Sequence, residues 1–225
     1  MFELQDESEL TANLPHAEFP TTPATGDSTP ANTSHSEIFL YLYAQLHAQS
    51  NKGNGTITAE EIFPELGKPQ ASGNFTQVAA AGRKLLELHN NHDAVEPYPL
   101  EINIKPGYDQ SDRETWRVDK MHRPQIQDPQ SGNITEDVTT IVYNPAITIS
   151  GIPALAEEFT IGSQSALAGV IEKYQVKADE KTGLRVDPNE WADDCDNPRL
   201  IVELIAKTTR IAVESARIIQ SLESE

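Results

Sequence analysis

The sequence predicts an α+β domain: a small antiparallel sheet packed with several helices, with a long C-terminal amphipathic helix and a disordered acidic N-terminal tail. Three observations predict this class. Apolar residues recur at helical spacing in several segments, and they alternate at period two between Leu100 and Gly151. Residues 1–36 show neither pattern. With 225 residues, the chain is long enough to bury one substantial core.

Residues 1–36 are predicted to be a disordered tail, which leaves residues 37–225 as one domain. Between Pro20 and Ser36, eleven of seventeen residues are Pro, Ser or Thr. A segment of this composition buries too little apolar surface to offset the entropy lost on ordering.

Three helices are predicted in the first half of the domain. The first begins at Ser36, which we expect to cap it, and ends before the turn-rich run that starts at Asn51. A short helix spans Thr58–Leu66. The third spans Phe75–Asn91, because Val78, Leu85 and Leu88 lie at helical spacing and prolines follow at 97 and 99.

Alternating residues then predict three strands, around 116–121, 138–143 and 147–149, with an irregular loop at Pro124–Glu136. A helix over Ser163–Tyr174 follows, capped by Ser163 or Ser165. The last helix begins after Asn197 as the capping residue and Pro198, and it continues for about seven turns. Thr208 and Ser215 interrupt its apolar seam, which favours a docked amphipathic helix over a coiled coil.

The net charge argues against a general binder of DNA or of membranes. The chain has 17 Lys and Arg against 35 Asp and Glu, a net charge of -18, and both targets are polyanions. Six of these excess negative charges lie in residues 1–36 and the other twelve in residues 37–225. An acidic N-terminus, the absence of a long apolar run and a lone Cys195 predict a cytoplasmic protein without membrane contact.

Motifs for catalysis, metals and cofactors are absent or incomplete. The chain has no phosphate-binding loop, no G-x-S-x-G elbow and no H-E-x-x-H pair. Ser50–Glu61 imitates a calcium-binding loop, but Lys52 occupies a position that should carry a carboxylate. Asn144-Pro145-Ala146-Ile147 lacks the aromatic residue that a base-flipping methyltransferase motif needs. We therefore expect no enzyme activity, no metal and no cofactor.

Two basic islands interrupt the acidic chain, each with a local net charge of +2, at residues 113–123 and 173–185. Basic groups mixed with amides and an aromatic residue are typical of surfaces that contact DNA phosphates and bases. Ordinary mixed-charge surface is the alternative, and composition alone favours it. The candidate DNA-binding residues are Arg113, Arg117, Lys120, Arg123, Gln164, Ser165, Lys173, Gln175 and Lys177.

About two thirds of the chain, from residue 76 onward, resembles the C-terminal target-recognition domain of Type ISP restriction-modification enzymes. The matching segments are Gly82–His89, Val95–Leu100, Arg117–Met121, Thr140–Asn144, Ile147–Pro153, Gly162–Leu167, Glu172–Lys177, Asp187–Trp191 and Asn197–Arg199 with the final helix. Phe39–His47 is more weakly similar to the helix that precedes this region. Tyr143, Tyr174 and Trp191 are expected in the core or as loop anchors.

The resemblance implies a non-catalytic module that reads an asymmetric double-stranded DNA site for helicase, nuclease and methyltransferase modules supplied in trans. Two segments depart from the family pattern: residues 124–137 hold three acids and no lysine where the family is lysine-rich, and Gln164 stands where it has a basic residue. Two alternatives remain: an acidic protein-interaction module that docks on or inhibits a helicase or methyltransferase, and a remnant of a disrupted restriction gene.

Overall fold

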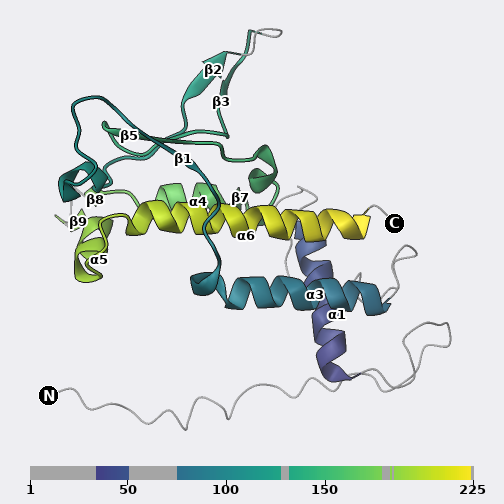
Figure 1. Cartoon of the computed structure of the whole chain (residues 1–225). Coiled ribbons are helices and arrows are strands. Elements are labelled where there is room, and N and C mark those ends of the chain that lie inside the picture. The colour runs from purple at the N-terminus through teal and green to yellow at the C-terminus, as the bar shows by residue number, and fades with distance from the viewer. Residues whose placement is uncertain (1–33, 51–74, 128–131, 179–182, 184, 224–225) are drawn as a thin grey trace, which may run out of the picture.

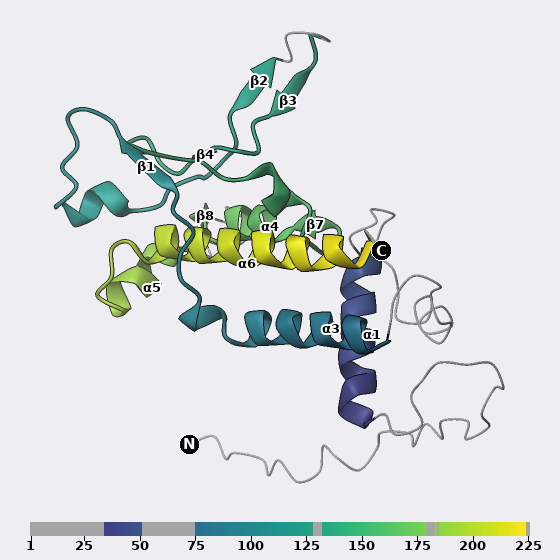
Figure 2. The same ribbon diagram turned by 45° about the vertical axis from the view of Figure 1, so that its right-hand side comes forward.

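The computed structural model describes residues 34–50, 75–127, 132–178, 183 and 185–223. In this part of the chain, helix α6 (Leu200–Glu223) runs through the middle of the molecule (Figure 1). A three-stranded sheet lies on one side of α6, and helices α1 (His35–Ser50) and α3 (Phe75–Asn90) lie on the other. Figure 2 shows the same layers after a 45° rotation. The predicted α+β class is confirmed.

Helix α6 is the element on which the others pack. Its Ile201, Ile205, Val213 and Ile219 are fully or almost fully buried. The Asn197 side chain makes hydrogen bonds at the N-terminal end of α6: Oδ1 accepts from Arg199 N at 3.0 Å, and Nδ2 donates to Glu203 at 2.9 Å. The prediction of a docked amphipathic helix is confirmed.

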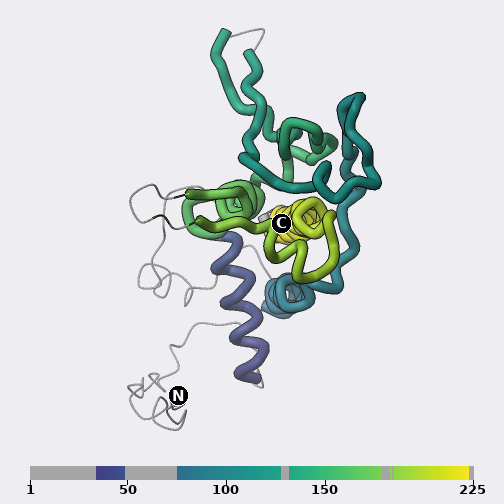
Figure 3. The backbone as a smooth tube through the Cα atoms, turned by 90° about the vertical axis from the view of Figure 1, so that its left-hand side faces the viewer, coloured from purple at the N-terminus to yellow at the C-terminus, as the bar shows by residue number. Residues whose placement is uncertain are grey.

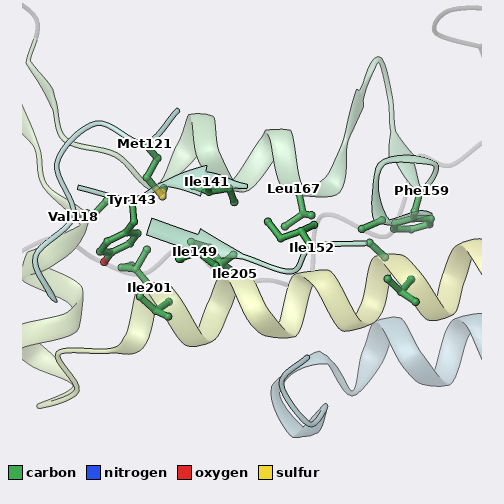
Figure 4. Packing of buried hydrophobic residues seen from close by; sticks show 14 of the residues in the cluster. Val118, Met121, Ile141, Tyr143, Ile149, Ile152, Phe159, Leu167, Ile201 and Ile205 are labelled. Atoms are coloured by element: carbon green, nitrogen blue, oxygen red, sulfur yellow. The ribbon is translucent and has the colours of Figure 1, made fainter. Parts of the chain in front are cut away.

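The main sheet is antiparallel and has the strand order β1–β5–β4. Its strands are β1 (Glu101–Ile104), β4 (Ile141–Val142) and β5 (Ile147–Ser150). Ile147 and Ile149 of β5 and Ile141 of β4 are fully buried and belong to the same core cluster as Ile201 and Ile205 of α6. Figure 4 shows Ile149 beside Ile205. Two of the three predicted strands are therefore confirmed.

The predicted strand at 116–121 is wrong. The 3₁₀ helix η3 (Arg113–Trp116) occupies its start, and only His122 forms an isolated β-bridge, with Val142. The third strand of the sheet is β1, which pairs with β5 from Glu101↔Ser150 to Ile104↔Ile147. The period-two pattern at 116–121 reflects alternating burial of an irregular segment, in which the carbonyls of Trp116, Arg117 and Val118 accept hydrogen bonds from side chains.

Three two-stranded ribbons and two further helices surround this core. The ribbons pair β2 (Gln125–Gln127) with β3 (Ile134–Glu136), β6 (Thr160–Ile161) with β7 (Gln164–Ser165), and β8 (Lys177–Ala178) with β9 (Arg185–Val186). The β2–β3 ribbon replaces the irregular loop predicted at Pro124–Glu136. Helix α4 (Ala166–Lys173) is capped by Ser165, as predicted, whereas α5 (Pro188–Asp194) was not predicted despite its Asp-Pro start. The described residues also form the 3₁₀ helices η2 (His92–Ala94) and η4 (Ala154–Glu157).

Helix α1 starts one residue earlier than predicted and uses a different cap. Ser34 N donates to Glu37 Oε2 at 3.0 Å, and Glu37 N donates to Ser34 Oγ at 3.3 Å. This reciprocal pair is a capping box, so Ser34 and not Ser36 caps the helix. Residues 1–33, the predicted helix at Thr58–Leu66 and most of the calcium-like loop lie outside the described residues.

Helices α1 and α3 cross at Gly82. The tube in Figure 3 shows the two helices next to each other, with α3 seen almost end-on. A Cβ at Gly82 would lie 1.9 Å from the Leu40 carbonyl oxygen, so the two backbones touch where a side chain would otherwise stand. The close approach buries Leu40 and Ala44 of α1.

Gly82→Ala should therefore destabilise the fold by about 1–3 kcal/mol, because the contact is with rigid backbone. Gly169→Ala on α4 is the matched control, since its Cβ would meet only the Gln164 side chain, at 3.5 Å. Removing that helical glycine should be neutral or slightly stabilising. Urea unfolding followed by circular dichroism measures both, and equal effects would contradict the close crossing.

A cluster of histidines and aromatic rings joins α1 to α3 and α6. The His89 ring lies between the Tyr43 hydroxyl (Nδ1 to Oη, 2.8 Å) and the Ser215 hydroxyl (Nε2 to Oγ, 2.9 Å). The rings of His47 and Phe159 pack against it at centroid distances of 5.1 and 5.3 Å. Desolvation, helped by the nearby His89, lowers the pKa of His47 to about 4, and desolvation also lowers the pKa of His89.

The fold should consequently lose stability in mild acid. In the unfolded chain the pKa of His47 is near 6.5. The contribution of neutral, buried His47 to the free energy of unfolding is therefore complete above that pH, and it is lost as the pH falls towards about 4. The loss attributable to His47 is up to about 3 kcal/mol. His47→Leu should flatten the stability profile between pH 6.5 and 4, whereas the exposed control His35→Leu should not. Parallel profiles for wild type and His47→Leu would contradict the account.

Candidate nucleic-acid interface

The segment that carries the first basic island is held by buried side chains. The Tyr143 hydroxyl donates to the Trp116 carbonyl at 2.8 Å. Asn144 Nδ2 donates to the carbonyls of Thr115 (2.9 Å) and Arg117 (2.8 Å). The three successive carbonyls of residues 115–117 thus accept hydrogen bonds from two side chains of the turn between β4 and β5.

Asn189 of α5 completes this clamp at Val118. Its Oδ1 accepts from Val118 N at 2.8 Å, and its Nδ2 donates to Val118 O at 2.9 Å. Asn189 Nδ2 also donates to Asp187 Oδ1 at 2.7 Å, so the amide is oriented from both sides. We call Tyr143, Asn144 and Asn189 the clamp; because it fixes the backbone of residues 115–118, the side chains of Arg113 and Arg117 start from fixed positions at the surface.

Both of these arginines are paired with acids at the end of α5. Arg113 contacts Asp196 at 2.8 Å and Asp193 at 3.3 Å, and Arg117 contacts Asp193 at 3.0 Å. The hydrogen bonds from Arg117 and Arg113 lower the pKa of Asp193. The bonds to Asp196 and then to Asp193 raise the pKa of Arg113, and the bond to Asp193 raises the pKa of Arg117. The pairs are solvent-exposed, and exposed pairs are weak enough to exchange for another anion.

The two basic islands meet along helix α4. At one end of this helix, Val176 N donates to the Asp119 carbonyl at 3.0 Å. At the other end, Glu157 accepts from Arg123 through Oε1 and from the Ser165 hydroxyl through Oε2. The chain from Asp119 to Arg123 thus runs beside α4: four extended residue steps span about 13 Å, and the eight residues of the helix rise about 12 Å.

These contacts bring the segments that carry the candidate residues together along α4, and we call this set of residues the α4 strip. It comprises Arg113, Arg117, Lys120, Arg123, Gln164, Ser165, Lys173, Gln175 and Lys177. Lys120, Lys173 and Lys177 are exposed and form no ion pair with the described part of the chain. They are the free cations of the strip. Gln164 is also exposed, and Gln175 donates to the Glu172 carbonyl at 3.4 Å.

Arg123 and Ser165 serve the fold. The Arg123 side chain is only 7% exposed and pairs with Glu157. Ser165 is buried, caps α4 by accepting from Ala168 N at 3.1 Å, and donates to Glu157 at 2.6 Å. Both residues hold the strip together, and their contact with DNA stays a prediction.

Two neighbouring aromatic rings, those of Tyr174 and Trp191, lie at the Lys173 end of the strip. Trp191 is 42% exposed, and its ring lies 5.9 Å from that of the half-buried Tyr174. Lys173 Nζ lies 5.4 Å from the Tyr174 centroid. Trp191 was expected in the core or as a loop anchor; its exposure corrects the first of these. Tyr143 is fully buried, as predicted.

The sequence analysis did not identify Trp191 as an exposed aromatic residue beside the strip, nor Glu157 and Asn189 as residues that hold the strip in place. The Asp-Pro pair before Trp191 is a helix-start signal that would have placed the tryptophan on a short helix. Among the described residues, no group of three or more His, Cys, Asp or Glu side chains could hold a metal ion. The described helices also include none long and apolar enough to cross a bilayer.

The family model of the Type ISP C-terminal specificity domain matches residues 8–204. The chain belongs to this family. The family is a specificity domain, which confirms the predicted non-catalytic class. The match begins at residue 8, inside the segment expected to be a tail.

Solved structures give the same answer for the fold. A nuclease-deletion mutant of the Type ISP enzyme LlaGI, in complex with a DNA substrate mimic, is 29% identical over 84% of this chain, with a TM-score of 0.57. The ATP-dependent Type ISP enzyme LlaBIII, bound to DNA, is 25% identical over 85% of the chain, with a TM-score of 0.61. A DrdV–DNA complex is 25% identical over 83%, with a TM-score of 0.56.

The chain spans only a small part of these relatives: 14% of the LlaGI chain, 11% of the LlaBIII chain and 18% of the DrdV chain. It corresponds to one specificity domain of a much longer polypeptide. No curated protein sequence matches it significantly.

The clamp makes a direct prediction for stability. Asn144→Ala removes the partners of two carbonyls and of the Ala146 and Ile147 amides, whose nitrogens lie 2.8 and 2.6 Å from Asn144 Oδ1. We expect about 3 kcal/mol of destabilisation, because buried polar groups lose their hydrogen bonds. Asn103→Ala, on exposed β1, is the control and should cost less than about 0.5 kcal/mol. Equal urea midpoints for the two variants would show that the clamp is dispensable.

Proposed function

We propose that this domain reads a double-stranded DNA site for the catalytic modules of a Type ISP-like restriction-modification system. The observation that carries the proposal is the α4 strip, in which two basic islands separated by about 50 residues of sequence come together on one surface. Solved relatives of this fold are bound to DNA or to a DNA mimic, which supports the same role.

Within the strip, the lysines and the arginines differ in how they can contact phosphates. Lys120, Lys173 and Lys177 are free to meet phosphates directly. Arg113 and Arg117 can do so only by exchanging Asp193 and Asp196 for phosphate oxygens. Gln164 and Gln175 carry amides of the kind that read base edges. The free cations are few for a chain of net charge -18, so tight binding requires additional contacts.

We infer that those contacts come from helicase and methyltransferase modules acting in trans. The relatives carry the equivalent of this domain within chains of which it forms 11–18%. A polypeptide of that length can supply basic surface that an acidic 225-residue chain lacks.

Sequence enrichment from a randomised duplex library tests the proposal, with the full chain alone and together with a Type ISP translocase–methyltransferase polypeptide added in trans. A single asymmetric motif should be enriched, more strongly with the partner. No enrichment in either arm would refute DNA recognition. If the chain instead binds the partner without DNA, and this binding survives high salt, it is the acidic docking module of the alternative hypothesis.

The three free lysines should control the salt dependence of DNA binding. Lys120→Gln, Lys173→Gln and Lys177→Gln should each weaken binding to any duplex and reduce the slope of log K against log salt by about 0.9. Lys84→Gln, on the exposed face of α3 away from the strip, should change neither quantity. Fluorescence anisotropy across a salt series measures both. Equal slopes for the strip and control variants would remove the strip from the DNA interface.

A further inference from the structure

The β2–β3 ribbon stands away from the rest of the molecule. In Figures 1 and 2 it projects from the sheet side. All six of its strand residues are exposed, including two isoleucines: Ile126 at 49% and Ile134 at 68%. A two-stranded ribbon with no layer beneath it gains little stability from its own packing, so these isoleucines are not there to build the core.

The root of the ribbon is nevertheless firmly held. Asp137 N donates to the Pro124 carbonyl at 2.7 Å, and Asp137 Oδ1 accepts from Thr139 N at 2.9 Å and from the Thr139 hydroxyl at 2.6 Å. Arg123, buried in its pair with Glu157, lies two residues before the first strand of the ribbon. The ribbon therefore rises from the Arg123 end of the α4 strip in a defined direction.

Each face of the ribbon combines an apolar group with a hydrogen-bonding group. Ile126 pairs with Thr135 across the strands, and Gln127 pairs with Ile134, so the two isoleucines lie on opposite faces. A surface that docks on a protein would gather its apolar side chains on one face. The Gln125 side chain lies on the Ile134 face and has no hydrogen-bond partner among the described residues, whereas Gln127 Nε2 donates to the Gly132 carbonyl at 3.1 Å.

We propose that the Ile134 face of this ribbon lies in the major groove of DNA and reads A·T base pairs, with Gln125 donating to and accepting from adenine and Ile134 contacting a thymine methyl group. The inference rests on the proposed function. The major groove is about 12 Å wide and 8.5 Å deep, and it admits a two-stranded ribbon. Gln125 and Ile134 lie on the same face, so a ribbon lying along the groove presents both side chains to the base edges. An amide beside a methyl-contacting side chain matches the adenine and thymine edges.

The charge of the ribbon agrees with reading bases rather than holding phosphates. Residues 124–137 contain three acids and no Lys or Arg, so this segment adds no attraction to the DNA backbone. Glu136 pairs with Gln125, and both lie at the root end of the ribbon. Affinity is left to Lys120, Lys173 and Lys177 along the strip, and the ribbon contributes sequence discrimination.

Enrichment from the randomised duplex library, with the full chain and its catalytic partner, tests the ribbon through Gln125→Ala and Ile134→Ala. Ile161→Ala is the matched control, because Ile161 is 63% exposed on the separate β6–β7 ribbon. All three sites are exposed, and thermal melting checks that each variant folds. Gln125→Ala should lower the preference for A·T over the other pairs at one position of the motif roughly 5- to 150-fold, because it removes a bidentate contact. Ile134→Ala should lower this preference at one position by a smaller factor, because it removes only an apolar contact. The salt slope should stay unchanged, because no charge is altered, and Ile161→Ala should behave like wild type.

The failures are distinguishable. If wild type selects a motif and both β2–β3 variants select it equally well, the ribbon does not read bases and the proposed function stands. If the variants keep the motif but lose affinity for the catalytic partner, the ribbon is a protein-docking arm and the inference is wrong. If wild type selects no motif, the proposed function fails and the inference fails with it.

Discussion

The surface described here depends on one set of hydrogen bonds, those that buried Tyr143, Asn144 and Asn189 make to the backbone of residues 115–118. A segment without strand or α-helix has no regular partner for its carbonyls and amides, and leaving them buried and unpaired is costly. The clamp supplies those partners from the sheet and from α5. It therefore couples the folding of the core to the placement of Arg113, Arg117 and Lys120.

The same coupling joins regions far apart in the sequence. Asn189 connects the first basic island to α5, and the Asp119–Val176 bond connects it to the second. Glu157 then bridges Arg123 and Ser165 at the opposite end of α4. Through these links, the strip and the root of the β2–β3 ribbon form one surface supported by α6. A chain with a large excess of acid can thus present a local basic surface, although the Asp193 and Asp196 pairs reduce its charge.

Periodicity predicted the elements whose stability comes from packing. Helices α3, α4 and α6 and strands β4 and β5 bury apolar side chains at regular spacing, so their residue patterns identify them. The segment at 116–121 alternates in the same way but is not a strand, because most of its backbone partners from Trp116 to Val118 are side chains 27 and 71 residues away. The residues of the strip could be chosen from local charge, whereas their meeting along α4 depends on these distant contacts. The prolines and the glycine of residues 124–136 favoured a loop, so the β2–β3 ribbon was not predicted. The exposure of Trp191 depends on tertiary packing and cannot be predicted from a single sequence.

In the proposed complex, DNA lies along the α4 strip and reaches the β2–β3 ribbon. Amide hydrogen exchange of the full chain, with and without a duplex at low salt, measures which residues DNA covers. Exchange should slow on DNA binding at residues 119–127 and 174–178, and it should stay unchanged in α1 and α3. Protection confined to α1 and α3, with residues 119–127 and 174–178 exchanging as in the free chain, would contradict this placement of the DNA.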